Sequence, residues 1–195
     1  SCINCNLSFD VANPSSDKNL EEVKKKLPKY DGLIWGGSSL NIYNDTPEIR
    51  RQISFMKKCF KNIKKILAIC WGMQVAVTAA GGEVKKGING SHIGIANDIE
   101  LTKQGLNSLF YKDKKNKFTT PAFNFDEVTE LPKDAILLSS DKVNNVMGVS
   151  FTAGNSEITG LQYHPDYEYY QMINLIAGRK ERLFNNKYFL NEDDY

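Results

Sequence analysis

The sequence contains few histidines and few cysteines, and neither type forms a complete metal or disulfide pattern. The 195 residues include two histidines, His92 and His164, which excludes a histidine-rich metal centre. Cys2 and Cys5 have the C-x-x-C spacing of metal and redox sites, but no second pair and no nearby histidine accompanies them. A chain of this length can bury a sizeable core without disulfides. We therefore expect its four cysteines to be reduced thiols, with no metal bound.

Long apolar runs, a basic leader and a strong charge imbalance are also lacking. No stretch approaches the roughly 18 to 20 apolar residues that span a membrane. The first residues are polar and lack the basic start of a signal peptide. The net charge is +2, and aromatic residues do not interleave the lysine clusters as they do on a nucleic-acid platform. We expect a cytoplasmic protein that binds neither membrane nor nucleic acid.

The composition that is present is that of an ordinary globular protein. Hydrophobic residues make up 41% and charged residues 25% of the chain. There is no internal repeat and no linker, which favours a single domain over residues 1–195. No nucleotide-binding P-loop occurs, so a step that consumes ATP would need another chain.

The stretch from Lys64 to Gly82 carries the strongest functional signal. Its apolar run, Ile66 to Ile69, followed by helix-like composition, predicts a buried strand, a tight turn at Cys70 and a helix. Such a nucleophile elbow holds a reactive side chain at the carboxyl edge of a sheet. The helix that begins at Trp71 would activate the thiol and offer backbone N–H groups to a developing oxyanion. The alternative for Cys70 is a buried core cysteine.

The segments before this elbow predict a parallel sheet. A helix is expected over 20–27, a buried strand over 31–35 and a second helix from Thr46 to about Asn62. Two buried strands separated by a helical crossover are typical of a doubly wound sheet. Ligands bind beyond the carboxyl ends of such strands, where Gly37 and Cys70 fall. The glycine pair at 36–37 is consistent with a backbone ligand site or with an ordinary turn.

The segments after the elbow predict shorter strands and a closing helix. An antiparallel meander is expected from about Glu83 to Phe151, with strands at 87–94, 95–101, 117–123, 135–140 and 146–151. A last buried strand is expected at 161–163, followed by helix from Tyr167 to Arg179 and on toward Phe184. The opening residues 1–9 could form a further strand.

Three residue types required for cysteine nucleophilic catalysis occur at suitable places. Cys70 lies at the elbow, His164 ends a later strand and Asp166 follows two residues on. Such chemistry needs a base for the thiol proton and a group that orients the base. The alternatives are a structural histidine at a strand end and a helix cap at Asp166.

These residues occur in motifs that resemble one family. AICWGMQ, around Cys70, resembles the G-x-C-x-G-x-Q motif of class I (triad-type) glutamine amidotransferases, and GLQYHPD, around His164, resembles their G-x-Q-x-H-P-E motif. DGLIWGGSS is similar to the strand and glycine loop that precede the family's oxyanion hole. FDEVTELP resembles a segment of stand-alone members similar to the amidotransferase domain of GMP synthase. The resemblance covers about Tyr30 to Arg182.

The resemblance implies a fold and a reaction. The fold is an α/β, three-layer, flavodoxin-like, mostly parallel sheet with an added antiparallel β meander. In the reaction, Cys70 would attack the side-chain amide of glutamine to form a γ-glutamyl thioester and release ammonia. His164 would act as base and then acid, and Asp166 would orient it. The N–H groups of Gly37 and Trp71 would form the oxyanion hole.

The resemblance also implies substrate contacts and partners. Gln74, Ser91, His92 and Asn124 match positions near the family's bound glutamine. No cofactor and no metal are implied. Ammonia would pass to an acceptor on a partner, such as a synthetase subunit.

The departures from the family pattern bear on the substrate. Ala68 replaces the first glycine, and Asp166 replaces a glutamate, with Glu168 as another candidate to orient the histidine. Asn124 and Phe125 stand where relatives often carry histidine and glycine. These changes keep two alternatives open: a γ-glutamyl hydrolase acting on another γ-glutamyl amide, and a degenerate domain that only binds. The family's first strand and helix are expected to be missing at the amino end.

Overall fold

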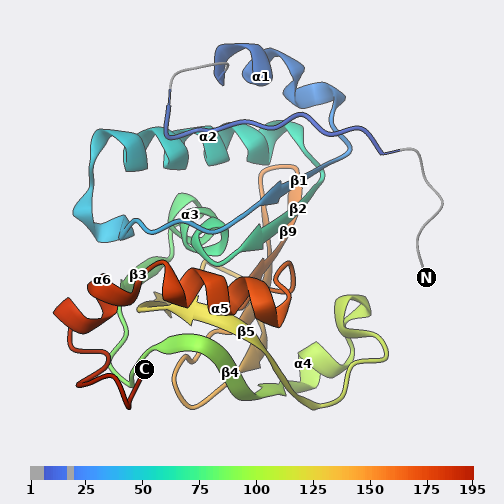
Figure 1. The fold of residues 1–195 in the computed structure, drawn as a ribbon. Coiled ribbons are helices and arrows are strands. Elements are labelled where there is room, and N and C mark those ends of the chain that lie inside the picture. The colour runs from blue at the N-terminus through green and yellow to red at the C-terminus, as the bar shows by residue number, and fades with distance from the viewer. Residues whose placement is uncertain (1–6, 17–19) are drawn as a thin grey trace.

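The computed structural model describes residues 7–16 and 20–195, which form a sheet covered by helices (Figure 1). The strands in this part of the chain are β1 Gly32–Trp35, β2 Lys65–Ile69, β3 Glu83–Lys86, β4 His92–Leu101, β5 Lys117–Asn124, β6 Asp126–Glu130, β7 Ile136–Ser140, β8 Gly148–Ala153 and β9 Ser156–Leu161. The α-helices are α1 Leu20–Lys26, α2 Pro47–Asn62, α3 Trp71–Ala79, α4 Lys103–Leu106, α5 Tyr169–Ala177 and α6 Lys180–Asn185. Short 3₁₀ helices lie at Leu27–Lys29, Ile42–Asn44 and Leu109–Tyr111.

The main sheet joins a parallel part to an antiparallel part. Its order is β1-β2-β9-β8-β7-β4-β5, and a second sheet pairs β3 with β6. Strands β1, β2 and β9 run parallel to one another, whereas every further neighbour in the main sheet is antiparallel. The predicted α/β class, a parallel core extended by an antiparallel meander, is confirmed. The antiparallel share is larger than the sequence suggested, because the meander continues the sheet directly from β9.

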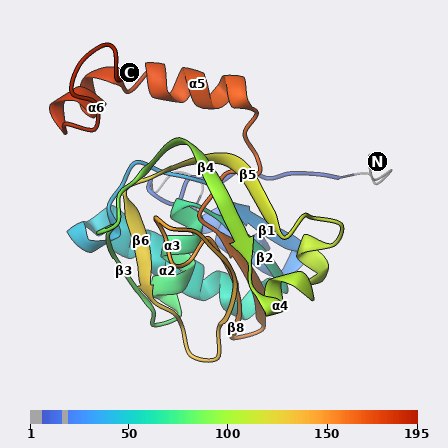
Figure 2. The ribbon, with the colours of Figure 1, turned by 90° about the horizontal axis from the view of Figure 1, so that it is seen from below.

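Helices cover the sheet from two sides. The views agree in placing α5 and α6 apart from α2, with strands between them (Figures 1 and 2). One core cluster packs α2 and α3 against the parallel strands, with Met56, Trp71 and Val75 among its buried members. A smaller cluster joins Phe123 of β5 to Met172 and Leu183 of the carboxyl-terminal helices. The site described below lies where β2, β9 and β5 end near these helices.

Several strands differ from the sequence prediction: β3 and β6 were not expected, and β8 lies two residues later than the strand expected at 146–151. A single strand, β4, replaces the pair expected at 87–94 and 95–101, because the chain passes through Gly94 at φ +106° and absorbs an irregularity between Ala96 and Ile99. The last strand ends at Leu161 instead of beginning there. Gly160 lies inside that strand, where a Cβ would come within 2.7 Å of the Met73 side chain on α3.

The predicted helices at 20–27 and from 46 to 62 are confirmed within a residue or two. Thr46 holds the N-cap position of α2, but its hydroxyl makes no capping hydrogen bond and is buried without a partner in the described residues. The expected C-x-x-C pair and most of the strand expected at 1–9 fall on residues 1–6, outside the described residues. Residues 7–9 form no regular structure. No helix in the described ranges is long and apolar enough to cross a membrane.

Candidate active site

Cys70 occupies a strained corner between β2 and α3, as the sequence predicted. Its backbone adopts φ 53° and ψ −108°, a conformation that costs energy for a residue with a side chain and is found preferentially at functional sites. The corner is tight because Gly72 N–H donates to the carbonyl of Gly36 at 3.2 Å. A Cβ on Gly72 would lie 2.2 Å from the carbonyl oxygen of Trp35, so only glycine fits there.

His164 and Asp166 follow β9, the neighbour of β2 in the sheet. His164 Nδ1 lies 3.1 Å from Asp166 Oδ1, and the imidazole stacks on Tyr167 with ring centroids 4.5 Å apart. The backbone N–H of His164 donates to Pro121 of β5 at 2.8 Å. Asp166 therefore reaches the imidazole despite being shorter than the family's glutamate. Glu168 instead begins α5, where its N–H donates to the side chain of Gln171.

The electrostatics of the pair favour a charged imidazole. Burial lowers the pKa of His164, but hydrogen bonds with Asp166 and Cys70 raise it by more, to about 9. Burial raises the pKa of Asp166, yet the hydrogen bond and charge of His164 bring it below its ordinary value. Hydrogen bonding to both partners thus holds a protonated His164 beside the sulfur at neutral pH. The other cysteine thiol in the described residues, that of Cys59, does not border the cleft, and burial raises its pKa to about 12.

The two residues predicted to form an oxyanion hole lie next to the nucleophile. A Cβ on Gly37 would come within 3.0 Å of His164 Cε1 and 3.9 Å of Cys70 Cβ, so the backbone of Gly37 borders both side chains. Trp71 is the first residue of α3, and the N–H groups of a first helical turn have no acceptor within their own helix. The predicted position of both residues beside Cys70 agrees with the structure.

Two buried glutamine side chains lie near the sulfur, and only Gln74 borders the cleft. Gln74 is buried, borders the cleft that contains Cys70, and donates to Gln162 Oε1 at 3.3 Å. Gln162 in turn donates to Cys70 Sγ at 3.6 Å. The sequence analysis selected Gln74 but not Gln162. The signal for Gln162 was its place in the GLQYHPD motif, two residues before the histidine.

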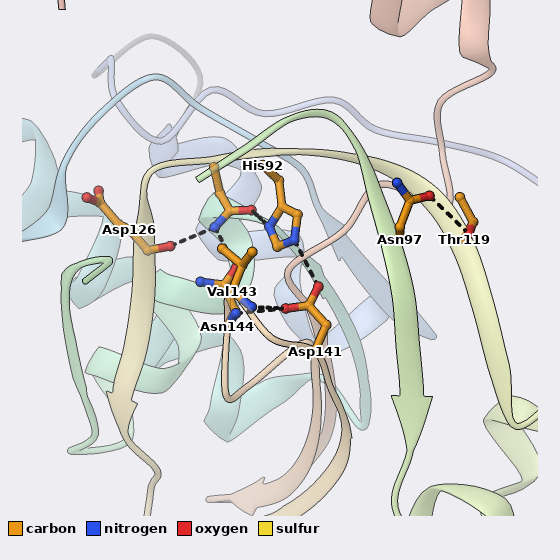
Figure 3. Close-up of polar contacts among 8 residues, drawn as sticks. His92, Asn97, Thr119, Asp126, Asp141, Val143 and Asn144 are labelled. Carbon is orange, nitrogen blue, oxygen red and sulfur yellow. Dashed lines mark hydrogen bonds and ion pairs between the residues drawn. The ribbon is translucent and has the colours of Figure 1, made fainter. Parts of the chain in front are cut away.

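The residues expected from the resemblance to contact substrate divide into two groups. Asn124, at the end of β5, borders the cleft, whereas Ser91 and His92 are not among its lining residues. His92 is 4% exposed, and both ring nitrogens are engaged: Nδ1 with Asn124 Oδ1 at 3.1 Å and Nε2 with Asp141 Oδ2 at 2.8 Å (Figure 3). The structure therefore places His92 behind Asn124 instead of facing the cleft.

This buried network fixes the amide of Asn124. Asn124 Nδ2 donates to the side-chain oxygen of Asn144 at 2.8 Å and to the carbonyl of Asp126 at 3.0 Å. Asp141 Oδ1 accepts backbone N–H groups from Val143 and Asn144 (Figure 3). Burial raises the pKa of Asp141, but the hydrogen bond from His92 lowers it below its ordinary value. The side-chain nitrogen of Asn144 is buried without a partner in the described residues, whereas both amide atoms of Asn124 are engaged, so these bonds hold Asn124 in one orientation.

The carboxyl-terminal helices contribute residues that the sequence analysis missed. Arg179 and Arg182 both line the cleft beside Cys70. The helix itself was predicted, but no local pattern connects a helix near residue 180 with a cysteine at residue 70. Only the packing of α5 and α6 against β4 and β5 brings these arginines to the site.

The fold and the site together define a class of protein. A cysteine at a strand–helix elbow beside a histidine held by a carboxylate is the arrangement used for covalent chemistry at a carbonyl carbon. The sequence matches the family model of glutamine amidotransferase class-I over residues 3–173, and the chain belongs to this family.

Several curated proteins are similar in sequence. The chain is 36% identical over 143 residues to a γ-glutamyl-L-1-hydroxyisopropylamide hydrolase from Pseudomonas sp, covering 72% of this chain and 48% of that protein. It is 30% identical over 146 residues to γ-glutamyl peptidase 4 from Arabidopsis thaliana, covering 74% and 57%. It is 32% identical over 149 residues to a glutamine-hydrolysing GMP synthase from Helicobacter pylori, covering 76% and 26%. The chain thus spans about half the length of the first two relatives.

Solved structures support the fold. A glutamine amidotransferase from Thermotoga maritima has a TM-score of 0.66 with this chain at 21% identity, covering 88% of this chain and 69% of that one. A likeness at this level of identity establishes the shared fold.

Proposed function

We propose that this protein hydrolyses a γ-glutamyl amide through a thioester on Cys70. The observation that carries the proposal is the strained elbow at Cys70 beside a His164 that is hydrogen-bonded to Asp166. The names of the relatives support it, since they describe hydrolysis of γ-glutamyl amides, γ-glutamyl peptides or glutamine.

In the first half of the reaction, Cys70 Sγ attacks the γ-carbonyl carbon and forms the carbon–sulfur bond. The thiol proton is transferred to His164 Nε2 before this attack, which gives the imidazolium, because Nδ1 is held by Asp166. His164 then gives that proton to the nitrogen of the leaving amine as the carbon–nitrogen bond breaks. A pKa of about 9 makes the imidazolium well populated at neutral pH, which suits this donation.

In the second half, water hydrolyses the thioester. Neutral His164 accepts a proton from the water, whose oxygen attacks the thioester carbon. The carbon–sulfur bond breaks, the proton returns to the sulfur, and glutamate leaves. In both halves the N–H groups of Gly37 and Trp71 stabilise the oxyanion, a contribution of about 3 kcal/mol per donor in enzymes of this type.

The preferred substrate is a γ-glutamyl amide whose leaving group is larger than ammonia. Asn124 and Phe125, which depart from the family pattern, border the cleft, and a further polar pocket adjoins it. The most similar relatives named above act on substituted γ-glutamyl amides and peptides, as their names state.

A second candidate is glutamine hydrolysis with transfer of ammonia to a synthetase partner. The segment FDEVTELP and the 32% identity to a glutamine-hydrolysing GMP synthase favour it. The two candidates share the chemistry at Cys70 and differ in the leaving group.

A substrate panel tests the proposal. Glutamate release is measured from γ-glutamylglycine, γ-glutamyl alkylamides and glutamine, with the wild-type protein and Cys70→Ser. We expect release from at least one substituted amide and loss of that release in the variant. Release from glutamine alone would favour the second candidate. If the folded protein released glutamate from none of these substrates, the domain would only bind them.

A further inference from the structure

A second pocket adjoins the cleft that contains Cys70. Asn41, Phe125, Asp126 and Arg182 line both. The cavity volume is about 30 Å³ in the cleft and about 150 Å³ in the neighbouring pocket. A buried water molecule needs roughly 10 to 15 Å³ on this scale. The cleft therefore holds little beyond a scissile group, while the neighbouring pocket has room for a small polar group.

Positive charge dominates the walls of these two cavities. Arg179 and Arg182 line the cleft, and Arg182 and Lys86 line the neighbouring pocket. The acidic lining residue is Asp126, which is buried and whose oxygens accept hydrogen bonds from Asn41 at 2.7 Å and from Tyr43 at 3.0 Å. Its carboxylate is thus held by neutral partners and forms no ion pair with the arginines.

The cavity cations make no close ion pair within residues 7–16 and 20–195, although the charges of Lys86 and Arg182 act on Asp126 and lower its pKa against the larger effect of burial. Most other ion pairs of this part of the chain lie on exposed surfaces, and Lys180, the neighbour of Arg179, pairs with Glu192. In contrast, no ion pair involves Arg179, Arg182 or Lys86 in the described residues. Burial and the charge of Arg182 lower the pKa of Arg179, which indicates two like charges held close together. An anion placed between them would relieve this repulsion.

The guanidinium of Arg179 is already oriented for such an anion. Its Nη2 donates to Ser39 Oγ at 2.8 Å, and the group lies 4.8 Å from the ring centroid of Phe123. Ser39 follows the glycine loop that borders the nucleophile, so Arg179 joins the carboxyl-terminal helices to the Cys70 side of the cleft. A guanidinium has five N–H donors, and one such bond leaves donors for a carboxylate.

We propose that Arg179 and Arg182 form a carboxylate-binding subsite beside Cys70, which holds a carboxylate of the γ-glutamyl substrate while the scissile amide lies against the sulfur. This inference rests on the proposed function for the identity of the substrate. The carboxylate has two possible sources: the α-carboxylate of the glutamyl group, or a carboxylate on the leaving amine. Both use the same bidentate chemistry with arginine.

Binding to a protein that cannot turn over substrate tests the subsite independently of catalysis. In a Cys70→Ala background, calorimetry measures the Kd of γ-glutamylglycine and of γ-glutamylglycinamide, which lacks the carboxylate on its leaving group. Each is measured again with Arg179→Gln and with Arg182→Gln. Arg50→Gln is the matched control, because Arg50 is an exposed arginine on α2 away from both cavities.

We expect each arginine variant to weaken binding of γ-glutamylglycine about tenfold or more, and Arg50→Gln to leave it unchanged. An equal loss for both ligands assigns the subsite to the α-carboxylate, and a loss confined to γ-glutamylglycine assigns it to the leaving group. Unchanged binding in both variants, or no binding of either ligand to the Cys70→Ala protein, overturns the inference. Arginine-dependent binding without glutamate release by the wild type would instead refute the proposed function.

Discussion

The link between His164 and Asp166 is the most informative contact at the scale of single residues. Burial lowers the pKa of His164, but the contacts with Asp166 and with Cys70 together raise it to about 9. Because the folded pKa exceeds the ordinary 6.5, this interaction stabilises the folded state fully below pH 6.5. The stabilisation is lost as the pH rises through about 9.

Asp166→Asn should therefore lower both the pKa of His164 and the rate. We expect kcat/KM for glutamate release to fall about a hundredfold. The alkaline limb of its pH profile, which reports loss of the imidazolium proton, should move to lower pH. Glu168→Gln is the control and should leave that limb in place, because the hydrogen bond to His164 Nδ1 comes from Asp166, whereas Glu168 bonds to Gln171. An unmoved limb in Asp166→Asn would mean that another group orients the histidine.

The core of the site could be predicted from sequence because its residues lie at the ends of strands with local signals. Cys70 follows an apolar run, and His164 and Asp166 follow another, so parallel pairing brings them to one edge. The orientation of His92 could not be predicted, because its position along the strand does not show that Asn124 and Asp141 engage both of its ring nitrogens. Arg179 and Arg182 carried no signal because tertiary packing alone relates them to Cys70.

At the scale of elements, the close approach of α3 to β1 shapes the elbow. Gly72→Ala would place a methyl group 2.2 Å from the carbonyl oxygen of Trp35, a backbone atom that cannot step aside without moving β1. We expect a loss of about 3 kcal/mol in the free energy of unfolding, measured by urea denaturation. Gly36→Ala is the matched control, because a Cβ there meets nothing within 4 Å. Equal stability of the two variants would contradict this account of the corner.

The buried network joins β4, β5 and the turn at residues 141–144. Asp141→Ala would leave the ring of His92 and the N–H groups of Val143 and Asn144 without their acceptor. We expect the free energy of unfolding to fall by about 3 kcal/mol near neutral pH. Asp31→Ala, at an exposed position, is the control and should change it by less than about 0.5 kcal/mol.

The acid dependence of the same variant provides a separate check. The folded pKa of Asp141 is lowered, so its contribution to stability is present above the ordinary pKa of 3.8 and is lost as the pH falls through the folded pKa. The difference in free energy of unfolding between the wild type and Asp141→Ala should therefore become smaller in strong acid. If this difference in free energy of unfolding did not change with pH, the negative charge of Asp141 would not be the source of its stabilising effect.

The elements also show which boundaries sequence patterns can resolve. Helix α2 was predicted closely, because proline at its first position and a regular apolar face mark both its start and its length. The prediction divided β4 into two strands at Gly94, because glycine is typical of strand ends. The strand instead continues through Gly94, which has a positive φ. The antiparallel share of the sheet depends on strand order, which no local pattern encodes.

At the scale of the whole molecule, the carboxyl-terminal helices dock through a small apolar cluster. Met172 is 2% exposed and packs with Phe123 and Leu183, so Met172→Ala should destabilise the protein by about 3 kcal/mol. It should also weaken γ-glutamylglycine binding, because Arg179 lies between these two helices and Arg182 lies on α6. Ile173→Ala is the matched control, since its side chain is 65% exposed and one residue away. If Met172→Ala were destabilised but bound γ-glutamylglycine as tightly as the wild type, the docking of these helices would not be needed for ligand binding.

The thioester on Cys70 is the central claim, and mass spectrometry of the trapped protein tests it most directly. The protein is treated with an electrophilic glutamine analogue, or quenched with acid during turnover of γ-glutamylglycine, and then digested. We predict one γ-glutamyl-derived label on the peptide that carries Cys70. The label should persist in Cys59→Ala and disappear in Cys70→Ala. A label on another residue, or turnover that survives Cys70→Ala, would contradict the account.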